Sequence, residues 1–394
     1  MIAFQLSEVQ RAIRGEALDG WLFCNFRHRD RLADELLGVP GETANSRLWI
    51  YAIPAQGEPV GILHCIEQDS LGDLPGKRLF YRTREELLSR LAPLGGKRWG
   101  VHQSENLPVI SYLDGGTAAV LAGQGLRLVS AEGLIQRFKG LLDEAGIEAH
   151  ERAAAHLYDM VTVAWDRVRS AYERGTAPRE GEIRDLFLSE FEMRGLVCDH
   201  PPIVAAGVNS GTPHYDFSGA GAVFREGDVI QFDLWAKERN PGGIYADIAW
   251  AGVYGDTVPA RTAGAFQDLT GAREGAFRFI GEELAAGRKV RGAGVDRKTI
   301  EILSGLGYAG AIRHRTGHGI DTEVHGSGVN LDSAEFPDDR FLLEGSCFSL
   351  EPGIYFEDFG LRTEIDVYIA QGRPVISGGD RQFTLLDCAP RRLA

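Results

Sequence analysis

Two aspartates interrupt apolar, strand-like segments in the second half of this sequence. Asp233 lies within Val-Ile-Gln-Phe-Asp-Leu-Trp, and Asp247 lies within Ile-Tyr-Ala-Asp-Ile-Ala-Trp. An ionised carboxylate in such a strand is costly unless it is paired or bound to a metal. Because Asn-Pro-Gly-Gly between the segments predicts a turn, we expect the aspartates to face each other across a hairpin. A divalent cation between them would remove their mutual repulsion.

A cluster of histidines follows further along the chain. His314 and His318 belong to His-Arg-Thr-Gly-His-Gly-Ile, and His325 stands seven residues after His318. Glycines on both sides of His318 permit a close approach of the backbone to neighbouring groups. A single histidine is more often an ordinary core residue, but three within twelve positions favour a functional site.

Two further segments supply carboxylates. Glu351 ends the apolar run Cys-Phe-Ser-Leu-Glu, after which Pro-Gly turns the chain. In Leu-Arg-Thr-Glu-Ile-Asp-Val, the two-residue period of a strand predicts that Arg362, Glu364 and Asp366 share one face. The spacing alone does not choose between Glu364 and Asp366 as the second functional acid.

The candidate acids and one histidine have the composition of a two-metal site. Asp233, Asp247, Glu351 and Glu364 carry four negative charges, and neutral His318 adds none. Two divalent cations would balance this charge. Ligands that are mostly oxygen with one imidazole favour Mn²⁺, with Co²⁺ or Zn²⁺ as alternatives. A pair of such ions generates hydroxide near neutral pH and polarises a carbonyl group.

The elements that must position these residues form two expected domains, since 394 residues exceed one ordinary core. Residues 1–147 alternate between strand and helix patterns, which predicts a small α/β domain. Residues 148–394 begin with a long helical pattern and repeat the order long helix, turn, shorter helix and strands. The repeat predicts one pseudo-symmetric α+β domain, with a site between its two sheets.

Two other patterns point to no site. Residues 305–310 fit the glycine pattern of dinucleotide-binding loops, but an expected helix precedes them and a strand follows, which indicates turn glycines. His150 and His156 resemble a zinc-binding helix motif, yet six helical steps place them roughly 240° apart around the helix. They cannot bind one ion, and we expect both on a solvated helix face.

Charge and composition exclude several classes of protein. The chain has 42 Lys and Arg against 56 Asp and Glu, a net charge of −14, and no basic block. Nucleic acids and membrane surfaces are therefore not expected partners. No apolar run approaches a membrane-spanning length, and the N-terminal segment lacks the apolar core of a signal peptide. Five cysteines without a CxxC pair favour a reducing compartment, so we expect a cytoplasmic protein.

The order Asp, Asp, His, Glu, Glu, set in HRTGHGI, LEPGIY and LRTEID, resembles that of the pita-bread metallopeptidases. This group includes Xaa-Pro aminopeptidase, prolidase, methionine aminopeptidase and creatinase. The N-terminal α/β domain resembles that of the prolidase and Xaa-Pro aminopeptidase branch. The resemblance implies a pita-bread fold over residues 148–394, a homodimer, and hydrolysis of the N-terminal Xaa-Pro bond of dipeptides or short proline-containing peptides.

The same resemblance implies a set of metal ligands. Asp233 corresponds to the ligand of one metal, and Asp247 and Glu364 correspond to two bridging carboxylates. His318 and Glu351 complete the other metal's coordination. Glu351 also corresponds to the general base that takes the proton of the attacking water.

Further positions match the family's substrate-binding and auxiliary residues. His214 corresponds to the histidine near the scissile amide, and His325 to the histidine that steadies the tetrahedral intermediate. His314 corresponds to the outer histidine of the metal-binding loop, and Arg362 to an arginine that orients the ligands. Arg315 replaces a glycine that is usual in the family, and it could bind the terminal carboxylate of a dipeptide.

The sequence also departs from the family elsewhere. Asp233-Leu234-Trp235 replaces the usual Asp-x-Gly, and the gap of 14 residues between the aspartates (247 − 233) is a few residues longer than usual. The insertion at 234–246 should change the rim of the cavity. Two alternatives stay open: a metal-free amidinohydrolase of the creatinase type, and a pita-bread interaction module without catalysis.

Overall fold

The computed structural model describes residues 5–379 and 381–390, so the outer ends of both expected domains lie outside the described residues. The chain divides into two compact units, Met1–Lys139 and Gly140–Ala394. This division falls eight residues before the expected boundary (147 − 139). The first long helix of the second unit, α6 (Glu144–Glu173), begins four residues before position 148.

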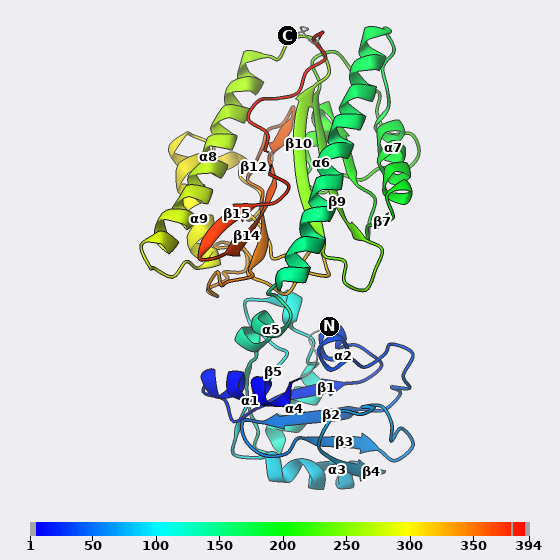
Figure 1. Cartoon of the computed structure of the whole chain (residues 1–394), viewed down its shortest axis with the longest axis vertical. Coiled ribbons are helices and arrows are strands. Elements are labelled where there is room, and N and C mark those ends of the chain that lie inside the picture. The colour runs from blue at the N-terminus through cyan, green and yellow to red at the C-terminus, as the bar shows by residue number, and fades with distance from the viewer. Residues whose placement is uncertain (1–4, 380, 391–394) are drawn as a thin grey trace. The chain divides into compact units, whose positions relative to one another are not determined.

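The N-terminal unit is an α/β layer structure around a mixed six-stranded sheet of order β4-β3-β2-β1-β5-β6 (Figure 1). Alternate residues of strand β1 point into two different cores. Trp21 and Phe23 belong to one core, and Leu22 and Cys24 belong to the other. The sheet is therefore buried on both faces, as expected for an α/β unit. Its elements are α1 (Leu6–Gly15), β1 (Gly20–Asn25), α2 (Arg31–Leu37), β2 (Trp49–Pro54), β3 (Val60–His64), β4 (Lys77–Tyr81), α3 (Arg84–Leu91), β5 (Arg98–Val101), α4 (Gly115–Gly123), β6 (Arg127–Ser130) and α5 (Glu132–Phe138).

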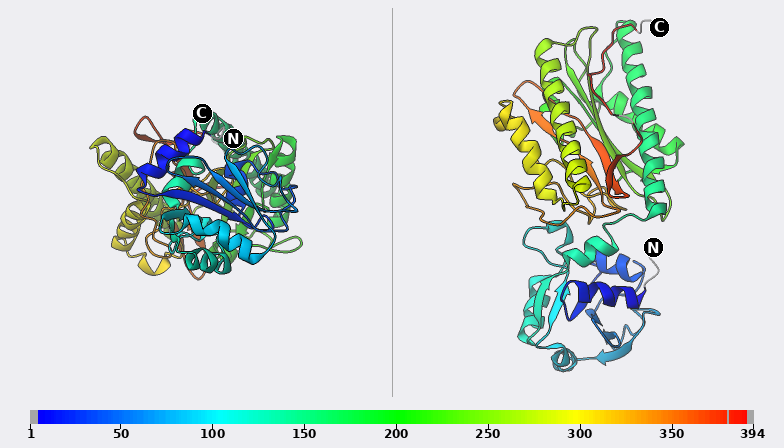
Figure 2. Two further views of the ribbon diagram at one scale, coloured as in Figure 1. Left: turned by 90° about the horizontal axis from the view of Figure 1, so that it is seen from below. Right: turned by 60° about the vertical axis from the view of Figure 1, so that its left-hand side comes forward.

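The C-terminal unit contains helices and strands in the predicted repeating order. In Figure 1, α6 and α7 cover β9 and β10, while α8 and α9 lie beside β14 and β15, and Figure 2 shows the same layers from the side. The remaining bounds are α7 (Glu180–Met193), β7 (Leu196–Val197), β8 (Ile203–Ala206), β9 (Val229–Glu238), β10 (Ala246–Val253), α8 (Ala260–Ala285), α9 (Gly292–Gly305), β11 (Cys347–Leu350), β12 (Gly353–Tyr355), β13 (Gly360–Arg362), β14 (Ile365–Ala370) and β15 (Arg373–Ile376).

The two halves of this unit correspond in detail. Each has a long helix followed by a helix of 14 residues, α7 and α9, and the residue before each shorter helix is an arginine. Arg179 forms an isolated β-bridge with Val223 just before β9, and Arg291 forms one with Phe341 before β11. The pseudo-symmetric α+β fold expected from the sequence is confirmed.

One expected strand is wrong. The segment 361–367 was expected as a single strand, but β13 ends at Arg362 and β14 begins at Ile365. The break occurs because β13 pairs with β12 whereas β14 pairs with β11, so the chain changes partner between them. Glu364 lies in the break and bridges Ala249 of β10, which links the two halves.

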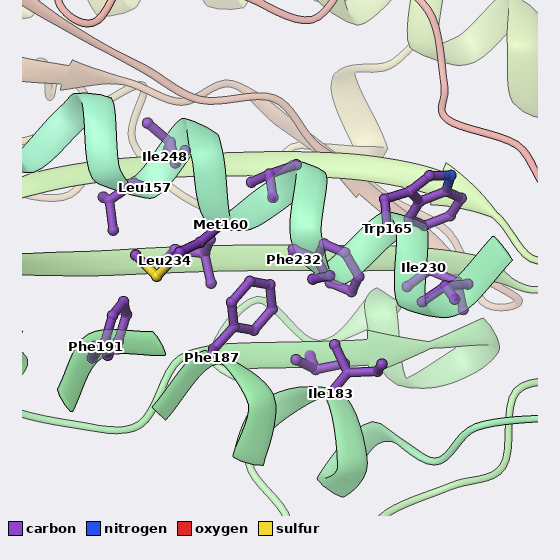
Figure 3. Close-up of a cluster of buried hydrophobic side chains, with 14 of the residues drawn as sticks. Leu157, Met160, Trp165, Ile183, Phe187, Phe191, Ile230, Phe232, Leu234 and Ile248 are labelled. Atoms are coloured by element: carbon purple, nitrogen blue, oxygen red, sulfur yellow. The ribbon is translucent and has the colours of Figure 1, made fainter. Parts of the chain in front are cut away.

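The core of the first half lies between the helices and the sheet (Figure 3). Large side chains of α6, α7, β9 and β10 fill it, and among the described helices none is long and apolar enough to cross a membrane. The labelled members are Leu157, Met160, Trp165, Ile183, Phe187, Phe191, Ile230, Phe232, Leu234 and Ile248.

Replacement of Phe187 by Ala should destabilise this unit strongly. Phe187 is fully buried, and its ring centroid lies 5.2 Å from that of Phe232 beneath the site-bearing strand β9. Removing a buried Phe side chain costs about 3–5 kcal/mol, so the urea midpoint of unfolding should fall. Met193→Ala, at the 70% exposed end of the same helix, is the control and should change stability by less than about 0.5 kcal/mol. Equal midpoints for the two variants would contradict this packing.

Candidate metal centre

The hairpin of β9 and β10 places both aspartates on one face of the sheet. In the antiparallel register Asp233 lies opposite Ala249, and Asp247 lies opposite Trp235. The aspartates are thus diagonal neighbours, and the expectation that they stand directly opposite is wrong by two residues. The diagonal separation of such positions, about 7–8 Å between backbones, leaves space for cations between the carboxylates.

The longer gap between the aspartates has a structural cause. Strand β9 continues beyond Asp233 to Glu238, and its end pairs with Leu196 and Val197 of β7. Part of the 14-residue gap is therefore strand and not turn. Trp235 in this extension donates a hydrogen bond from its indole to Asp199 at 2.6 Å.

His318 is fixed by the glycine-rich segment around it. A Cβ atom on Gly317 would overlap the carbonyl oxygen of Ser349, so only glycine permits this approach. The His318 backbone N–H donates to Ser349 Oγ at 3.1 Å. Its Nε2 lies 3.6 Å from Asp247 Oδ2 and 3.5 Å from Glu351 Oε1. Burial lowers the pKa of His318 to about 4, so the imidazole is neutral at physiological pH.

Asp247, His318 and Glu364 form a group whose ligand atoms all lie within 4.8 Å of one another. All three are buried, and Asp247 Oδ1 has no hydrogen-bond partner among the described residues. Burial raises the pKa of Asp247 well above its usual range, and the charges of Asp233 and Glu351 raise it further. The pKa of Glu364 rises for the same reasons, burial first and then the charge of Asp247. Such a set is unfavourable when ionised without a cation, and the donors fit a divalent ion.

Asp233 and Glu351 lie next to this group, and other partners contact them. The Arg362 guanidinium donates a close, charged hydrogen bond to Asp233 Oδ2. Glu351 Oε1 accepts from Ser349 Oγ at 3.3 Å. Burial raises the pKa of Glu351, but the charges of His318, His314 and Arg362 outweigh it and lower the value to about 2.

The structure distinguishes the two acids that the spacing left open. Glu364 belongs to the group with Asp247 and His318. Asp366 instead accepts the backbone N–H of Asp247 at 2.7 Å through its Oδ2, behind the ligand side chains. The two acids differ because the chain breaks at Glu364, so 364 and 366 belong to different local structures.

A polar network lines one side of the site. His314 contacts Tyr355 Oη through Nε2 at 2.8 Å, and Nδ1 contacts the carbonyl of Arg315 at 2.7 Å. Arg362 donates to Tyr355 Oη at 3.2 Å and to the Pro213 carbonyl at 3.2 Å. Arg362 thus connects the His314 side of the network to Asp233.

Two of the expected histidines are exposed. The His325 ring stands edge-on to that of His318, with centroids 4.4 Å apart, and the charge of His318 lowers the pKa of His325 to about 3. His214 follows the short helix Gly207–Gly211, and its charge acts on Asp233, His314 and His325. Both side chains are thus open to solvent, and His325 lies directly against His318.

A model of metallopeptidase family M24 matches residues 147–371, more than half of the chain. The chain belongs to metallopeptidase family M24. The matched range contains all five candidate ligands, from Asp233 on β9 to Glu364 just before β14, and the family consists of metal-dependent peptidases. The resemblance drawn from the sequence is confirmed at the level of family, fold and enzyme class.

Individual relatives of this M24 peptidase include dipeptidases. It is 26% identical over 359 residues to a probable dipeptidase PepE from Mycobacterium tuberculosis, covering 85% of this chain and 84% of the relative. It is 32% identical over 168 residues to an Xaa-Pro dipeptidase from Lactobacillus delbrueckii subsp. lactis, covering 41% and 40% of the two chains. The crystal structure of dipeptidase PepE from Mycobacterium ulcerans matches with a TM-score of 0.73 at 21% identity, over 98% and 97% of the chains. These matches favour a metallopeptidase over the amidinohydrolase and the non-catalytic module.

Sequence reasoning missed several residues of the M24 peptidase site. Tyr355 joins His314 to Arg362, and Gln231 accepts the backbone N–H of Arg362 at 3.0 Å. Gln231 stands two residues before Asp233 on the same strand face, a spacing that could have identified it. Tyr355 falls within the LEPGIY motif, but its hydroxyl partners come from other segments and left no signal in the local sequence.

The expectation for His150 is wrong. Its side chain is completely buried, and it contacts the Tyr245 carbonyl through Nδ1 at 2.6 Å. The helical spacing did place His156 elsewhere, beside Arg194 at 3.5 Å, so the two histidines do not share an ion. His150 is buried because α6 packs against β9 and β10, and its ring centroid lies 6.4 Å from that of Tyr368 on β14.

Replacing Gly317 by Ala should weaken metal binding in this M24 peptidase. The new Cβ would overlap the Ser349 carbonyl and displace His318 from the carboxylates. We expect roughly ten-fold or greater loss of divalent-metal affinity, measured by titration of the metal-stripped protein. Gly310→Ala is the matched control, because a Cβ at Gly310 has no neighbour within 4 Å. Equal affinities for both variants would contradict the role of the glycine.

Proposed function

We propose that the protein is a dinuclear metal-dependent exopeptidase that hydrolyses the Xaa-Pro bond of dipeptides. The observation that carries this proposal is the buried cluster of Asp247, His318 and Glu364, with Asp233 and Glu351 beside it. A relative named as an Xaa-Pro dipeptidase and another named as a probable dipeptidase support the substrate class.

The charge of the site supports two ions. Asp233, Asp247, Glu351 and Glu364 carry four negative charges when ionised, and His318 is neutral at physiological pH. Two divalent cations neutralise this set and stabilise the ionised form of acids whose pKa values burial raises. Four oxygen-bearing ligands and one imidazole favour Mn²⁺.

Each residue has a proposed role in the reaction. Asp233 would hold one ion, Asp247 and Glu364 would hold both ions, and His318 and Glu351 would hold the second. When bound, the ions supply a nucleophile near neutral pH and polarise the scissile carbonyl. Glu351 is ionised at neutral pH, so it can accept the proton of the attacking water.

The flanking residues bind and orient the substrate. His214 contacts the peptide near the scissile amide, and His325 donates a hydrogen bond to the oxygen of the tetrahedral intermediate. His314 binds the residue after the scissile bond, with its ring fixed by Tyr355. Arg362 orients Asp233 through their charged hydrogen bond.

Arg315 is proposed to bind the terminal carboxylate of the dipeptide. Its guanidinium is half-buried, and the part of the chain that the structure describes provides no hydrogen bond or ion pair for it. Its charge acts on His318, His325 and Glu351, which places it beside the cluster. A cation without a partner at this rim fits a carboxylate one residue beyond the scissile bond.

Compartment and assembly remain part of the proposal. All five cysteines are free, which supports a reducing compartment and hence the cytoplasm. The homodimer rests on the family resemblance, and light scattering on the purified protein tests it.

Metal removal and substrate length test the function directly. The Mn²⁺-loaded enzyme should contain two ions per chain by mass spectrometry and should hydrolyse Ala-Pro, with Ala-Ala as the comparison for proline preference. Chelator should abolish the activity, and Mn²⁺ should restore it. Cleavage of Ala-Pro-Ala as fast as Ala-Pro would indicate an aminopeptidase. Absence of divalent-metal binding, with activity that ignores chelator, would overturn the proposal.

Arg315→Ala should selectively reduce the hydrolysis of dipeptides whose C-terminal carboxylate is free. A charged hydrogen bond contributes about 1.5–3 kcal/mol, so kcat/KM for Ala-Pro should fall roughly 10–100-fold. Ala-Pro amide lacks the negative charge of the terminal carboxylate. The wild type and Arg315→Ala should therefore hydrolyse it with the same kcat/KM. Metal content should not change, and Arg315→Lys should retain part of the preference. Unchanged kinetics on Ala-Pro would exclude this role.

A further inference from the structure

The seam between the two halves of the C-terminal unit runs directly behind the proposed bridging carboxylates. Glu364 donates its backbone N–H to the Ala249 carbonyl at 3.2 Å, forming an antiparallel bridge between the halves. Continuing this register by two residues places Asp247 opposite Asp366. The relative position of these backbones therefore fixes the separation of the Asp247 and Glu364 side chains.

At the pair of Asp247 and Asp366, a side-chain oxygen takes the place of the backbone carbonyl that would accept the N–H in a regular strand pair. Asp366 Oδ2 accepts the Asp247 N–H at 2.7 Å. Asp366 is completely buried in β14, and its Oδ1 has no hydrogen-bond partner among the described residues. An apolar residue of the same size would leave the buried Asp247 N–H without an acceptor. Asp366 therefore bonds directly to the backbone of one proposed metal ligand.

His150 of α6 supports the same seam from the other side. Its Nδ1 donates to the Tyr245 carbonyl at 2.6 Å, which fixes the tautomer, so Nε2 accepts from Ser377 Oγ at 2.6 Å. Ser377 in turn donates its backbone N–H to the Asp366 carbonyl at 3.0 Å. His150 Nε2 lies 3.8 Å from Asp366 Oδ2. The carbonyl of residue 245 and the N–H of residue 247 are thus both bound by buried side chains.

We propose that Asp366, supported by His150, is a positioning residue that fixes the backbone of Asp247 relative to Glu364 and thereby sets the spacing of the two bridging carboxylates. This inference rests on the proposed metal site. Neither residue touches the substrate or the ions. Groups that orient metal ligands in this way typically change metal affinity about 10–100-fold when removed.

Metal affinity, measured independently of catalysis, tests the proposal. Mn²⁺ is titrated calorimetrically into the metal-stripped wild type, Asp366→Ala and Asp366→Asn. We expect Asp366→Ala to weaken Mn²⁺ binding roughly 10–100-fold, because the Asp247 N–H loses its acceptor. Asp366→Asn keeps a carbonyl oxygen at the same position and should bind close to wild type. If Asp366→Ala does not fold, Asp366→Leu fills a similar volume without an acceptor and replaces it.

The matched control is another buried aspartate that contacts a histidine. Asp30 of the N-terminal unit lies 2.7 Å from His102 Nδ1, and both are buried. Asp30→Ala should lower the unfolding midpoint of the metal-stripped protein but bind Mn²⁺ like the wild type. Equal losses of affinity in Asp30→Ala and Asp366→Ala would reduce Asp366 to a stabilising residue and overturn the positioning role.

The outcomes separate this inference from the proposed function. If the wild type binds no divalent metal, the proposed function fails. If the wild type binds Mn²⁺ and Asp366→Ala binds it equally well, the metal site stands and the positioning role is wrong. Weaker binding in Asp366→Ala, with recovery in Asp366→Asn, supports the inference.

Discussion

The main physical constraint on the C-terminal unit is that several carboxylates lie close together in its buried interior. Asp233 and Asp247 enter from the hairpin of one half, whereas Glu351 directly follows β11 and Glu364 lies in the break between β13 and β14 of the other half. Burial and mutual repulsion raise the pKa values of Asp247 and Glu364, and Arg362 offsets part of the charge through its hydrogen bond to Asp233. The remaining negative charge fits the binding of cations. The glycines beside His318, the break in the chain at Glu364 and the polar network around Tyr355 all serve to bring these acids together with one neutral imidazole.

The internal duplication explains how two corresponding loops, one containing His214 and the other His318, are held in place. In the first half, buried Glu180 of α7 accepts the backbone N–H groups of Ala206 and Ala222, which bracket the segment containing His214. In the second half, buried Asp296 of α9 accepts the N–H groups of Thr316 and Ser333, which bracket the segment containing His318. Corresponding helices thus use a buried acid to fix corresponding loops. Because such acids are fully hydrogen-bonded, they can remain in the interior without a metal.

Differences from the usual family pattern gather at the rim of the site. Arg315 stands where the family usually has a glycine, whereas the close backbone contact beside His318 is made by Gly317, which is retained. Trp235, in the part of β9 beyond Asp233, donates a hydrogen bond to Asp199, and Asp233 and Asp247 keep the regular antiparallel register of β9 and β10. The departures from the family pattern therefore leave Asp247, His318 and Glu364 grouped together.

The sequence by itself determined the family, the repeated helix and strand order, and the identity of the candidate acids and histidines. These are local properties, since apolar periodicity and the motifs HRTGHGI and LEPGIY are read within a few residues. The choice between Glu364 and Asp366, the diagonal placement of Asp233 and Asp247, and the burial of His150 required the tertiary structure. The first depends on the Ala249–Glu364 bridge between the halves, whose residues are more than 100 positions apart and leave no local pattern. The other two depend on the exact register of the β9–β10 hairpin and on what packs around α6, which residue types alone do not specify.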